Sequence, residues 1–337
     1  MTEPAPSFSR LSTYSGIWQG IYPGKPAYLP QQYPDLTGKT AIVTGANTGI
    51  GFEVVKLLYE KNCNVIAVVR TESKGLEARE KILADVKSKG TIGVIGGCDF
   101  MDLNTIKSAA TKIINVLGDN SLNIIIHNAG LMAPNSDGTS EQGYEAMISS
   151  NVLGPQLLQH FLDDAFLKKD GDLKRIVWVS SCTHLMAFRE YGINWENPTF
   201  KDVPIEKRPD HQTLYGQSKA ANILQAKAWA TKKADMVTDI GCVSVSCFPG
   251  ILRTQLTRGW GSLTKRMISW MGYDSVYGAY SELFAALSPK LTTNDQGAYI
   301  IPFGQVGEPR TDVKAGLTNG TDLKMWDMVE DMIKPFF

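Results

Sequence analysis

Short apolar runs alternate with amphipathic segments along most of this chain. The runs are rich in Val, Ile and Ala, as in strands that are buried on both faces of a parallel sheet. The segments between them repeat apolar residues at helical spacing. This alternation predicts an α/β fold with a doubly wound, seven-stranded parallel sheet. Strands are expected at 40–44, 64–69, 91–97, 175–179, 243–247 and 297–301, with one more before Asn128, and helices at 49–61, 76–88, 105–116 and 141–167.

The chain divides into an N-terminal extension, residues 1–37, and a single domain, residues 38–337. The extension holds six of the sixteen prolines together with six aromatic residues, a composition that rarely forms helices. We expect it to pack against the domain or a second subunit, and a disordered arm is the alternative. At the other end of the chain, Leu323, Trp326 and Val329 have the spacing of one apolar helix face, which predicts a closing amphipathic helix.

A glycine-rich turn follows the first predicted strand. Gly45, Gly49 and Gly51 have the spacing Gly-x-x-x-Gly-x-Gly, and a helical pattern begins within the same turn. A strand, turn and helix of this kind hold a pyrophosphate at the positive end of the helix. Glycine lets the backbone turn sharply and approach the phosphates. The sequence therefore predicts a dinucleotide site in a Rossmann fold, formed by Gly45, Asn47, Thr48, Gly49, Ile50 and Gly51.

The second predicted strand ends in Arg70, which bears on the choice of dinucleotide. A site for NAD usually has a carboxylate here that binds the ribose 2′-hydroxyl, whereas an arginine accommodates a 2′-phosphate. A guanidinium is also the planar donor that suits phosphate oxygens. We therefore expect Arg70 to favour NADPH, and the alternative is that Arg70 is a solvated loop cation.

Tyr215 and Lys219 lie four residues apart at the start of a strongly helical segment. On a helix they share one face, so an ammonium group is held beside a phenol. Because a positive charge favours the phenolate, we expect the pKa of Tyr215 to fall below its usual value of about 10. A phenol with a lowered pKa can donate and accept a proton near neutral pH. The pair predicts an acid–base site on this helix.

In this order the motifs resemble those of the short-chain dehydrogenases/reductases, in the branch of the retinol dehydrogenases and the WW-domain oxidoreductase. The resemblance covers residues 36–302 and includes further residues in the order that the family has them. These residues are Asp99 and Phe100 after the third strand, Asn128, Ala129 and Gly130 after the fourth, Asn151, Ser181 after the fifth, and Pro249, Gly250, Leu252 and Thr254 after the sixth.

The resemblance implies an oxidoreductase with a nicotinamide cofactor, and Arg70 indicates that this cofactor is NADPH/NADP+. Ser181 would donate a hydrogen bond to the substrate oxygen, and Tyr215 would exchange a proton with it. Lys219 would hold the nicotinamide ribose, and Asn151 would position a water that links Lys219 to solvent. In the same family Asp99 corresponds to the acid that binds adenine, and the Pro-Gly run that begins at Pro249 corresponds to the contact with nicotinamide.

Two segments bear on the substrate. An insertion at 182–214 separates Ser181 from Tyr215, and it either packs beside the substrate or is a surface excursion. Residues 255–290 correspond to the family's substrate-covering segment, and their apolar bulk indicates a hydrophobic, bulky ketone or secondary alcohol. Ordinary helix packing and a contact with a lipid surface are the alternative interpretations of that segment.

Composition narrows the functional classes. The 337 residues include 34 basic and 34 acidic ones, so no nucleic-acid footprint is indicated. The five cysteines form no Cys-x-x-Cys pair and indicate reduced core residues of a cytoplasmic protein. The four histidines lack metal-ligand spacing, so no metal site is expected. The sequence shows neither the apolar core of a signal peptide nor a run that approaches a membrane span.

We expect a carbonyl reductase or alcohol dehydrogenase that acts on a small hydrophobic carbonyl or alcohol substrate with NADPH. The alternatives are a retinol or steroid dehydrogenase on a lipid surface, and a regulator that senses NADPH without turnover. The intact set of Ser181, Tyr215 and Lys219 argues against the regulator, because a scaffold does not need all three. For the oligomeric state, the assembly that we consider is a homodimer.

Overall fold

The computed structural model describes residues 4–8, 10–132, 138–170, 173–253 and 272–337. Its centre is one eight-stranded sheet in the order β3-β2-β1-β4-β5-β6-β7-β8. Neighbouring strands are parallel from β3 to β7, and β8 runs antiparallel to β7. The strands are β1 Thr40–Thr44, β2 Asn64–Val68, β3 Ile92–Ile95, β4 Leu122–His127, β5 Arg175–Val179, β6 Val243–Cys247, β7 Tyr299–Ile301 and β8 Gln305–Gly307.

The seven parallel strands confirm the expected sheet, and β8 is a strand that the sequence analysis missed. It pairs with β7 through the register Ile300 with Val306, and it has only three residues. Gln305 and Val306 are exposed, so β8 lacks the apolar run by which the other strands were recognised. β3 and β7 are also shorter than the sequence predicted, because residues 91, 96–97 and 297–298 lie outside the paired strands.

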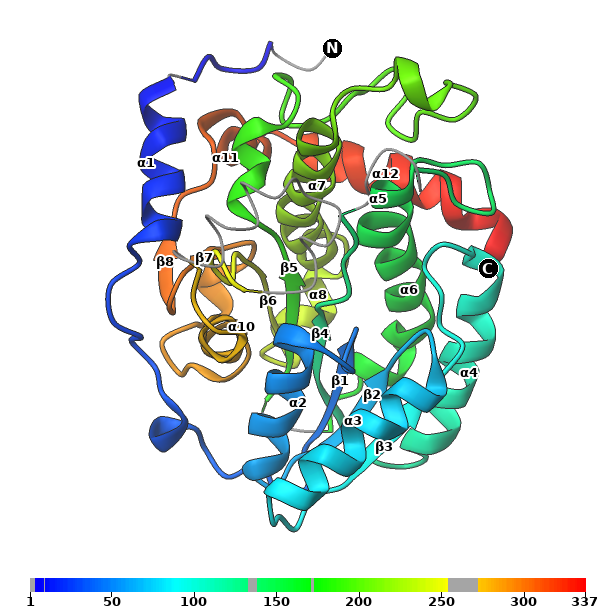
Figure 1. Ribbon diagram of the computed structural model, residues 1–337, viewed down its shortest axis with the longest axis vertical. Coiled ribbons are helices and arrows are strands. Elements are labelled where there is room, and N and C mark those ends of the chain that lie inside the picture. The colour runs from blue at the N-terminus through cyan, green and yellow to red at the C-terminus, as the bar shows by residue number, and fades with distance from the viewer. Residues whose placement is uncertain (1–3, 9, 133–137, 171–172, 254–271) are drawn as a thin grey trace.

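Helices cover both faces of the sheet, as expected (Figure 1). Alternation along the strands explains the two layers: Ile42 and Ile125 face α4, α6, α7 and α12, whereas Val43 and Ile126 face α2, α3 and α10. No helix of the described ranges is both long and apolar enough to cross a membrane. The helices are α1 Arg10–Ile21, α2 Gly49–Glu60, α3 Glu72–Asp85, α4 Ile106–Leu117, α5 Ala146–Ile148, α6 Gly154–Phe166, α7 His211–Lys232, α8 Ala234–Asp239, α10 Ser275–Leu287, α11 Thr311–Gly316 and α12 Thr321–Ile333.

The single helix expected at 141–167 begins later and is interrupted. Glu145 ends an extended stretch, and its carboxylate accepts hydrogen bonds from the N–H groups of Met147 and Ile148, both at 2.8 Å. That cap starts the helical run at α5. A π-helical turn, Ser149–Leu153, then joins α5 to α6. The turn contains Asn151, and such turns often occur where a helix presents a side chain to a functional site.

The N-terminal extension contains the helix α1, which differs from the expectation that this segment is non-helical. The six prolines explain the difference, because all of them lie before or after the twelve residues of α1. Beyond α1, Tyr28 and Tyr33 are buried against the domain. The N–H of Ala27 donates to the carbonyl of Phe303 at 3.0 Å. Figure 1 shows α1 in dark blue at the edge of the domain.

Candidate active site

A cavity of ≈ 1350 Å³ opens at the carboxyl ends of β1, β2, β4, β5 and β6. It lies where the strand order reverses between β1 and β4, which is the usual ligand position in a doubly wound sheet. The volume exceeds the roughly 300–1,000 Å³ of a pocket for one small ligand. The predicted site residues that line it are Gly45, Asn47, Thr48, Gly49, Ile50, Arg70, Asp99, Phe100, Asn128, Ala129, Gly130, Ser181, Tyr215, Lys219, Pro249, Gly250 and Leu252.

Three predicted residues are not part of the cavity lining described by the structure. Gly51 lies behind the glycine turn, where α2 packs against β1 and β4. Asn151 lies behind the segment that follows β4, and it acts on the cavity through hydrogen bonds. Thr254 lies outside the described residues, as do residues 255–271 of the expected substrate-covering segment.

The glycine turn brings the backbones of β1, α2 and β4 into close contact. A Cβ on Gly45, whose φ is +66°, would lie 2.9 Å from the Cα of Ala129. A Cβ on Gly51 would lie 2.5 Å from both the Gly45 oxygen and the Asn128 Nδ2. Thr48 precedes α2 and makes no side-chain hydrogen bond to its first turn. The N–H groups of that turn thus keep their capacity to bind an anion such as a pyrophosphate.

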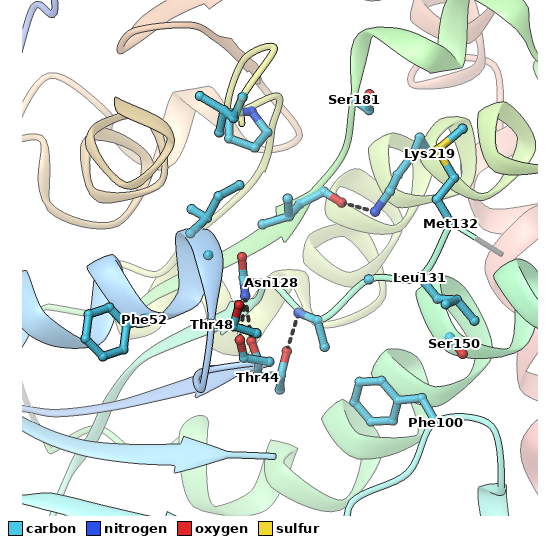
Figure 2. A pocket seen from close by; sticks show the side chains of 18 of the residues that line it. Thr44, Thr48, Phe52, Phe100, Asn128, Leu131, Met132, Ser150, Ser181 and Lys219 are labelled. Carbon is cyan, nitrogen blue, oxygen red and sulfur yellow. Dashed lines mark hydrogen bonds between the residues drawn. The ribbon is translucent and has the colours of Figure 1, made fainter. Parts of the chain in front are cut away.

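Asn128 and Thr44 fix the two strand ends that flank this turn (Figure 2). The Asn128 amide donates to the Thr44 carbonyl at 2.8 Å, and the Thr44 hydroxyl accepts from the N–H of Ala129 at 2.9 Å. These bonds join the carboxyl ends of β1 and β4 at the reversal point of the sheet. Asn128 therefore holds the wall of the site in place, in addition to lining it.

Arg70 lines the cavity at the end of β2, together with Lys74 in the first turn of α3. Both side chains are exposed, and the Arg70 carbonyl accepts from the N–H of Gly97 at 3.0 Å. Lys74, which was not among the residues predicted from the sequence, is thus a second cation at this end of the cavity. Two exposed cations here attract an anionic group such as a phosphate.

The helix α7 carries Tyr215 and Lys219 into the cavity. The Asp210 carboxylate caps its start, accepting from the N–H groups of Gln212 and Thr213 at 2.9 and 3.1 Å. One turn later Tyr215 faces the cavity, and the Lys219 ammonium lies 5.4 Å from the centre of the Tyr215 ring. The Lys219 Nζ also donates to the carbonyl of Val179 at 2.8 Å, as Figure 2 shows. The structure thus brings together the two residues paired in the sequence.

The expected lowering of the Tyr215 pKa is contradicted. Burial raises the pKa of Tyr215 above its ordinary value, because removal from water disfavours the phenolate. Burial also lowers the pKa of Lys219 to about 7. The ammonium lies over the ring and bonds to a carbonyl, so its field does not offset the desolvation of the hydroxyl. Burial therefore shifts the two pKa values toward the neutral form of each group, and that of Lys219 lies near neutral pH.

Glu282 is a buried carboxyl that the sequence analysis did not select. It comes from α10, it is fully buried, and neither of its oxygens has a hydrogen-bond partner among the described residues. Burial raises the pKa of Glu282 to about 8, while the charge of Lys219 lowers it. Conversely, the Glu282 charge raises the pKa of Lys219. The two groups therefore influence each other across the carboxyl end of the sheet.

Ser181 lines the cavity directly after β5. Its hydroxyl oxygen accepts from the N–H of Thr183 at 3.2 Å and lies 3.0 Å from the Thr183 hydroxyl, in a bond that either group can donate. When Thr183 donates, the Ser181 proton is available to an oxygen in the cavity. Figure 2 shows Ser181 on the same side of the cavity as Lys219 and Met132.

The buried His184 holds the backbone of Ser181. Its Nδ1 lies 2.7 Å from the Ser181 carbonyl, and its Nε2 accepts from the N–H of Arg310 at 3.0 Å. Because Nε2 accepts, the ring proton is on Nδ1 and is donated to Ser181. Burial lowers the pKa of His184 to about 4, so the ring is neutral near pH 7. This arrangement makes His184 a positioning residue for Ser181.

Asn151 contacts the chain rather than the cavity. Its side-chain oxygen accepts from the N–H of Leu131 at 2.7 Å, and its amide donates to the carbonyl of the same residue at 3.0 Å. The Asn151 backbone carbonyl accepts from the Asn222 amide at 2.7 Å. Asn151 therefore fixes the segment after β4 against α7, one residue beyond Gly130.

The insertion at 182–214 was expected either to pack beside the substrate or to be a surface excursion. It borders the cavity at its start and runs over the surface further along. Its first residues form a helical turn, Cys182–Met186, in which Cys182, Thr183 and Met186 line the cavity. Further along, Phe200 is buried in the apolar cluster that contains Tyr215. Most of residues 201–210 are exposed. The insertion thus begins beside the site and continues as a surface loop.

The chain is similar to proteins of known family. A family model described as short chain dehydrogenase matches residues 39–193. A short-chain dehydrogenase/reductase of Neocamarosporium betae is 36% identical, covering 96% of this chain and 94% of the relative. A short-chain dehydrogenase/reductase of Phomopsis amygdali is 32% identical, covering 98% of this chain and 99% of the relative. The fold is also similar to a crystal structure from Mycobacterium Paratuberculosis, with a TM-score of 0.67 at 22% identity over 91% of this chain and 97% of that one.

Proposed function

Because the chain belongs to the short-chain dehydrogenase/reductase family and is thus an oxidoreductase, we propose that it transfers hydride between NADPH and a hydrophobic carbonyl or alcohol. The observation that carries the proposal is the gathering of Tyr215, Lys219 and Ser181 around one cavity that also contains the glycine turn. A bound nicotinamide supplies or accepts the hydride in such a site.

The glycine turn fits the pyrophosphate of a dinucleotide. The first turn of α2 opens into the cavity, and the side chain of Thr48 does not occupy its N–H groups. Gly45 and Gly51 leave no space for a Cβ, so the turn keeps its backbone close to the neighbouring strands. The N–H groups of the residues that follow Thr48 would hold the phosphates, and Asp99 would face the adenine end.

Arg70 and Lys74 support NADPH as the preferred form. They line the cavity at the end of β2, the position at which a dinucleotide site selects between a ribose hydroxyl and a ribose phosphate. The guanidinium of Arg70 offers paired donors to a phosphate, and Lys74 adds a second positive charge. A carboxylate at this position would instead favour NADH.

At the end of the cavity opposite Arg70, three residues would have different roles in acid–base catalysis. Ser181 would donate a hydrogen bond to the substrate oxygen, where negative charge develops during reduction. Tyr215 would donate its proton to the same oxygen, and its raised pKa keeps that proton in place at neutral pH. Lys219, when charged, would hold the nicotinamide ribose and favour the phenolate that Tyr215 leaves behind.

An apolar substrate suits the rest of this end of the cavity. Leu131, Met132, Met186 and Ile251 line the cavity. Leu131 and Met132 belong to the apolar cluster around Tyr215, and Met186 ends the turn that follows Ser181. An apolar wall gains about 25 cal/mol for each Å² of apolar surface that a ligand buries. A ketone or secondary alcohol with a bulky apolar substituent would therefore bind better than a small polar carbonyl.

Oxidation of NADPH in the presence of a panel of aryl ketones tests the proposal. We expect turnover with NADPH, and slower turnover with NADH, on at least the more apolar ketones. Tight binding of NADPH without turnover of any carbonyl, or of any alcohol with NADP+, would favour a regulator that senses the cofactor. Activity that appears only with lipid vesicles would favour a retinol or steroid type of dehydrogenase on a lipid surface.

A further inference from the structure

The N-terminal helix α1 contributes side chains to the cavity. Ile17 and Ile21 line it, although they come from the extension that precedes the residues matched by the family model. They lie four residues apart and so share one face of α1. Trp18 is 62% exposed, so it lies on the solvent side of the same helix, and Tyr22, directly after the helix, is 60% exposed.

Two glycines allow α1 to approach the domain closely. A Cβ on Gly16 would lie 2.7 Å from the Cδ1 of Leu185, in the turn that follows Ser181. A Cβ on Gly20 would lie 2.7 Å from the Cζ of Phe248, directly after β6. Both neighbours belong to segments that flank Ser181 and Pro249. The helix therefore lies at the end of the cavity where the chemistry takes place, away from Arg70.

Contacts on both sides of α1 hold it in this position. Before the helix, the ring of Phe8 lies 4.2 Å from the guanidinium carbon of the buried Arg310. At its end, the carbonyl of Ile21 accepts a hydrogen bond from the hydroxyl of Tyr273 at 3.3 Å. The following chain continues into the buried Tyr28. The contacts fix α1 relative to the cavity from both ends.

We propose that Ile17 and Ile21 form a substrate-contacting wall that determines how large an apolar group the enzyme accepts. The inference rests on the proposed function, because the ligand in contact with the wall is the apolar substituent of the carbonyl substrate. The two side chains are half-buried, have no charge, and face the space bordered by Met186 and Ile251. A shorter side chain at either position enlarges this space, and a larger one fills it.

Kinetics with two ketones of different size test whether Ile17 and Ile21 select substrates by size. In the full-length protein, Ile17→Ala and Ile21→Ala should raise kcat/KM for para-phenylacetophenone relative to acetophenone by about tenfold, whereas Ile17→Trp should lower that ratio. The change should occur mainly in KM, because the wall binds substrate and does not touch the reacting oxygen. Trp18→Ala, on the solvent side of α1, is the matched control and should leave the ratio unchanged. Equal ratios in all four variants would overturn the proposal.

A second measurement does not depend on turnover. Cysteine variants at positions 17 and 18, Ile17→Cys and Trp18→Cys, are labelled with N-ethylmaleimide in the full-length chain, with the wild-type rate subtracted. The thiol of Ile17→Cys should react about tenfold more slowly than that of Trp18→Cys, and para-phenylacetophenone with NADP+ should slow it further. Equal rates, or no protection by the ketone, would contradict the wall. If no carbonyl is turned over but the protection is seen, the proposed reaction fails and the wall stands.

Discussion

Lys219 and Glu282 lie within electrostatic reach of each other although they come from helices on opposite faces of the sheet. Lys219 is 3% exposed and Glu282 is fully buried. Burial lowers the pKa of the lysine to about 7 and raises the pKa of the carboxyl to about 8, while each charge favours the charged form of the other. Both pKa values lie near neutral pH, so a change in the charge of either group bears on the pKa of the other in that range.

The lysine titration predicts the pH dependence of cofactor use. As pH rises through about 7, Lys219 loses the ammonium that would hold the nicotinamide ribose. We expect kcat/KM for NADPH, at saturating ketone, to fall by about tenfold per pH unit above that midpoint. Glu282→Gln removes the carboxyl whose charge raises the Lys219 pKa, so the midpoint should move to lower pH, and the shift should be small because Glu282 is mostly protonated near pH 7. The exposed Glu80→Gln is the control, and a midpoint that is the same in both variants would refute the coupling.

Glu282 also predicts how the stability of the fold changes with pH. Its folded pKa of about 8 lies above the ordinary value of about 4.3, so the folded state binds more protons between these values. Its contribution to the free energy of unfolding therefore falls as pH rises through this window, by up to about 1.4 kcal/mol per pH unit. Below pH 7, Lys219 is charged in both the folded and the unfolded state, so it does not change how the free energy of unfolding depends on pH.

Urea unfolding from about pH 5 to about pH 7 measures this slope directly. Glu282→Gln should become increasingly stable relative to the wild type as pH rises across that range, because glutamine does not titrate. A stability difference that stays constant over the range would show that Glu282 is not buried as a neutral acid.

The cations at the end of β2 predict the cofactor preference. Arg70→Asp removes the guanidinium and places a carboxylate where the ribose would bind, so it should lower kcat/KM for NADPH and raise it for NADH. Since a charged hydrogen bond contributes about 1.5–3 kcal/mol, the NADPH value should fall roughly ten- to a hundredfold. Arg79→Asp makes the same charge change on α3 outside the cavity lining and is the matched control. An unchanged ratio of the two cofactors would reject the role of Arg70.

The parts of the fold with strong periodicity were predictable from the sequence. β1, α2 and the turn between them follow from a buried apolar run, three glycines and a helical pattern. β8 was not predictable, because two of its three residues are exposed and its pairing depends on the neighbouring β7. The helix α1 was missed because the prolines of the extension were counted together, although none of them lies within it.

The identity of the site residues was predictable from the sequence, but their burial and the resulting pKa values were not. Ser181, Tyr215 and Lys219 were selected in sequence order, and they line one cavity. The direction of the Tyr215 pKa was wrong, because the spacing of two side chains gives their proximity and not their desolvation. The sequence does contain a signal for Glu282, namely a carboxyl on an otherwise apolar helix face. It lies three residues after Ala279 and three before Ala285.

The most direct test is the turnover of Tyr215→Phe, measured as NADPH oxidation with an aryl ketone alongside the Kd for NADPH. The phenylalanine keeps the ring and removes the proton that Tyr215 would donate to the substrate oxygen. The account predicts that kcat falls by at least about a hundredfold while NADPH binding persists. A variant that binds NADPH normally and keeps a tenth of the wild-type kcat would contradict it.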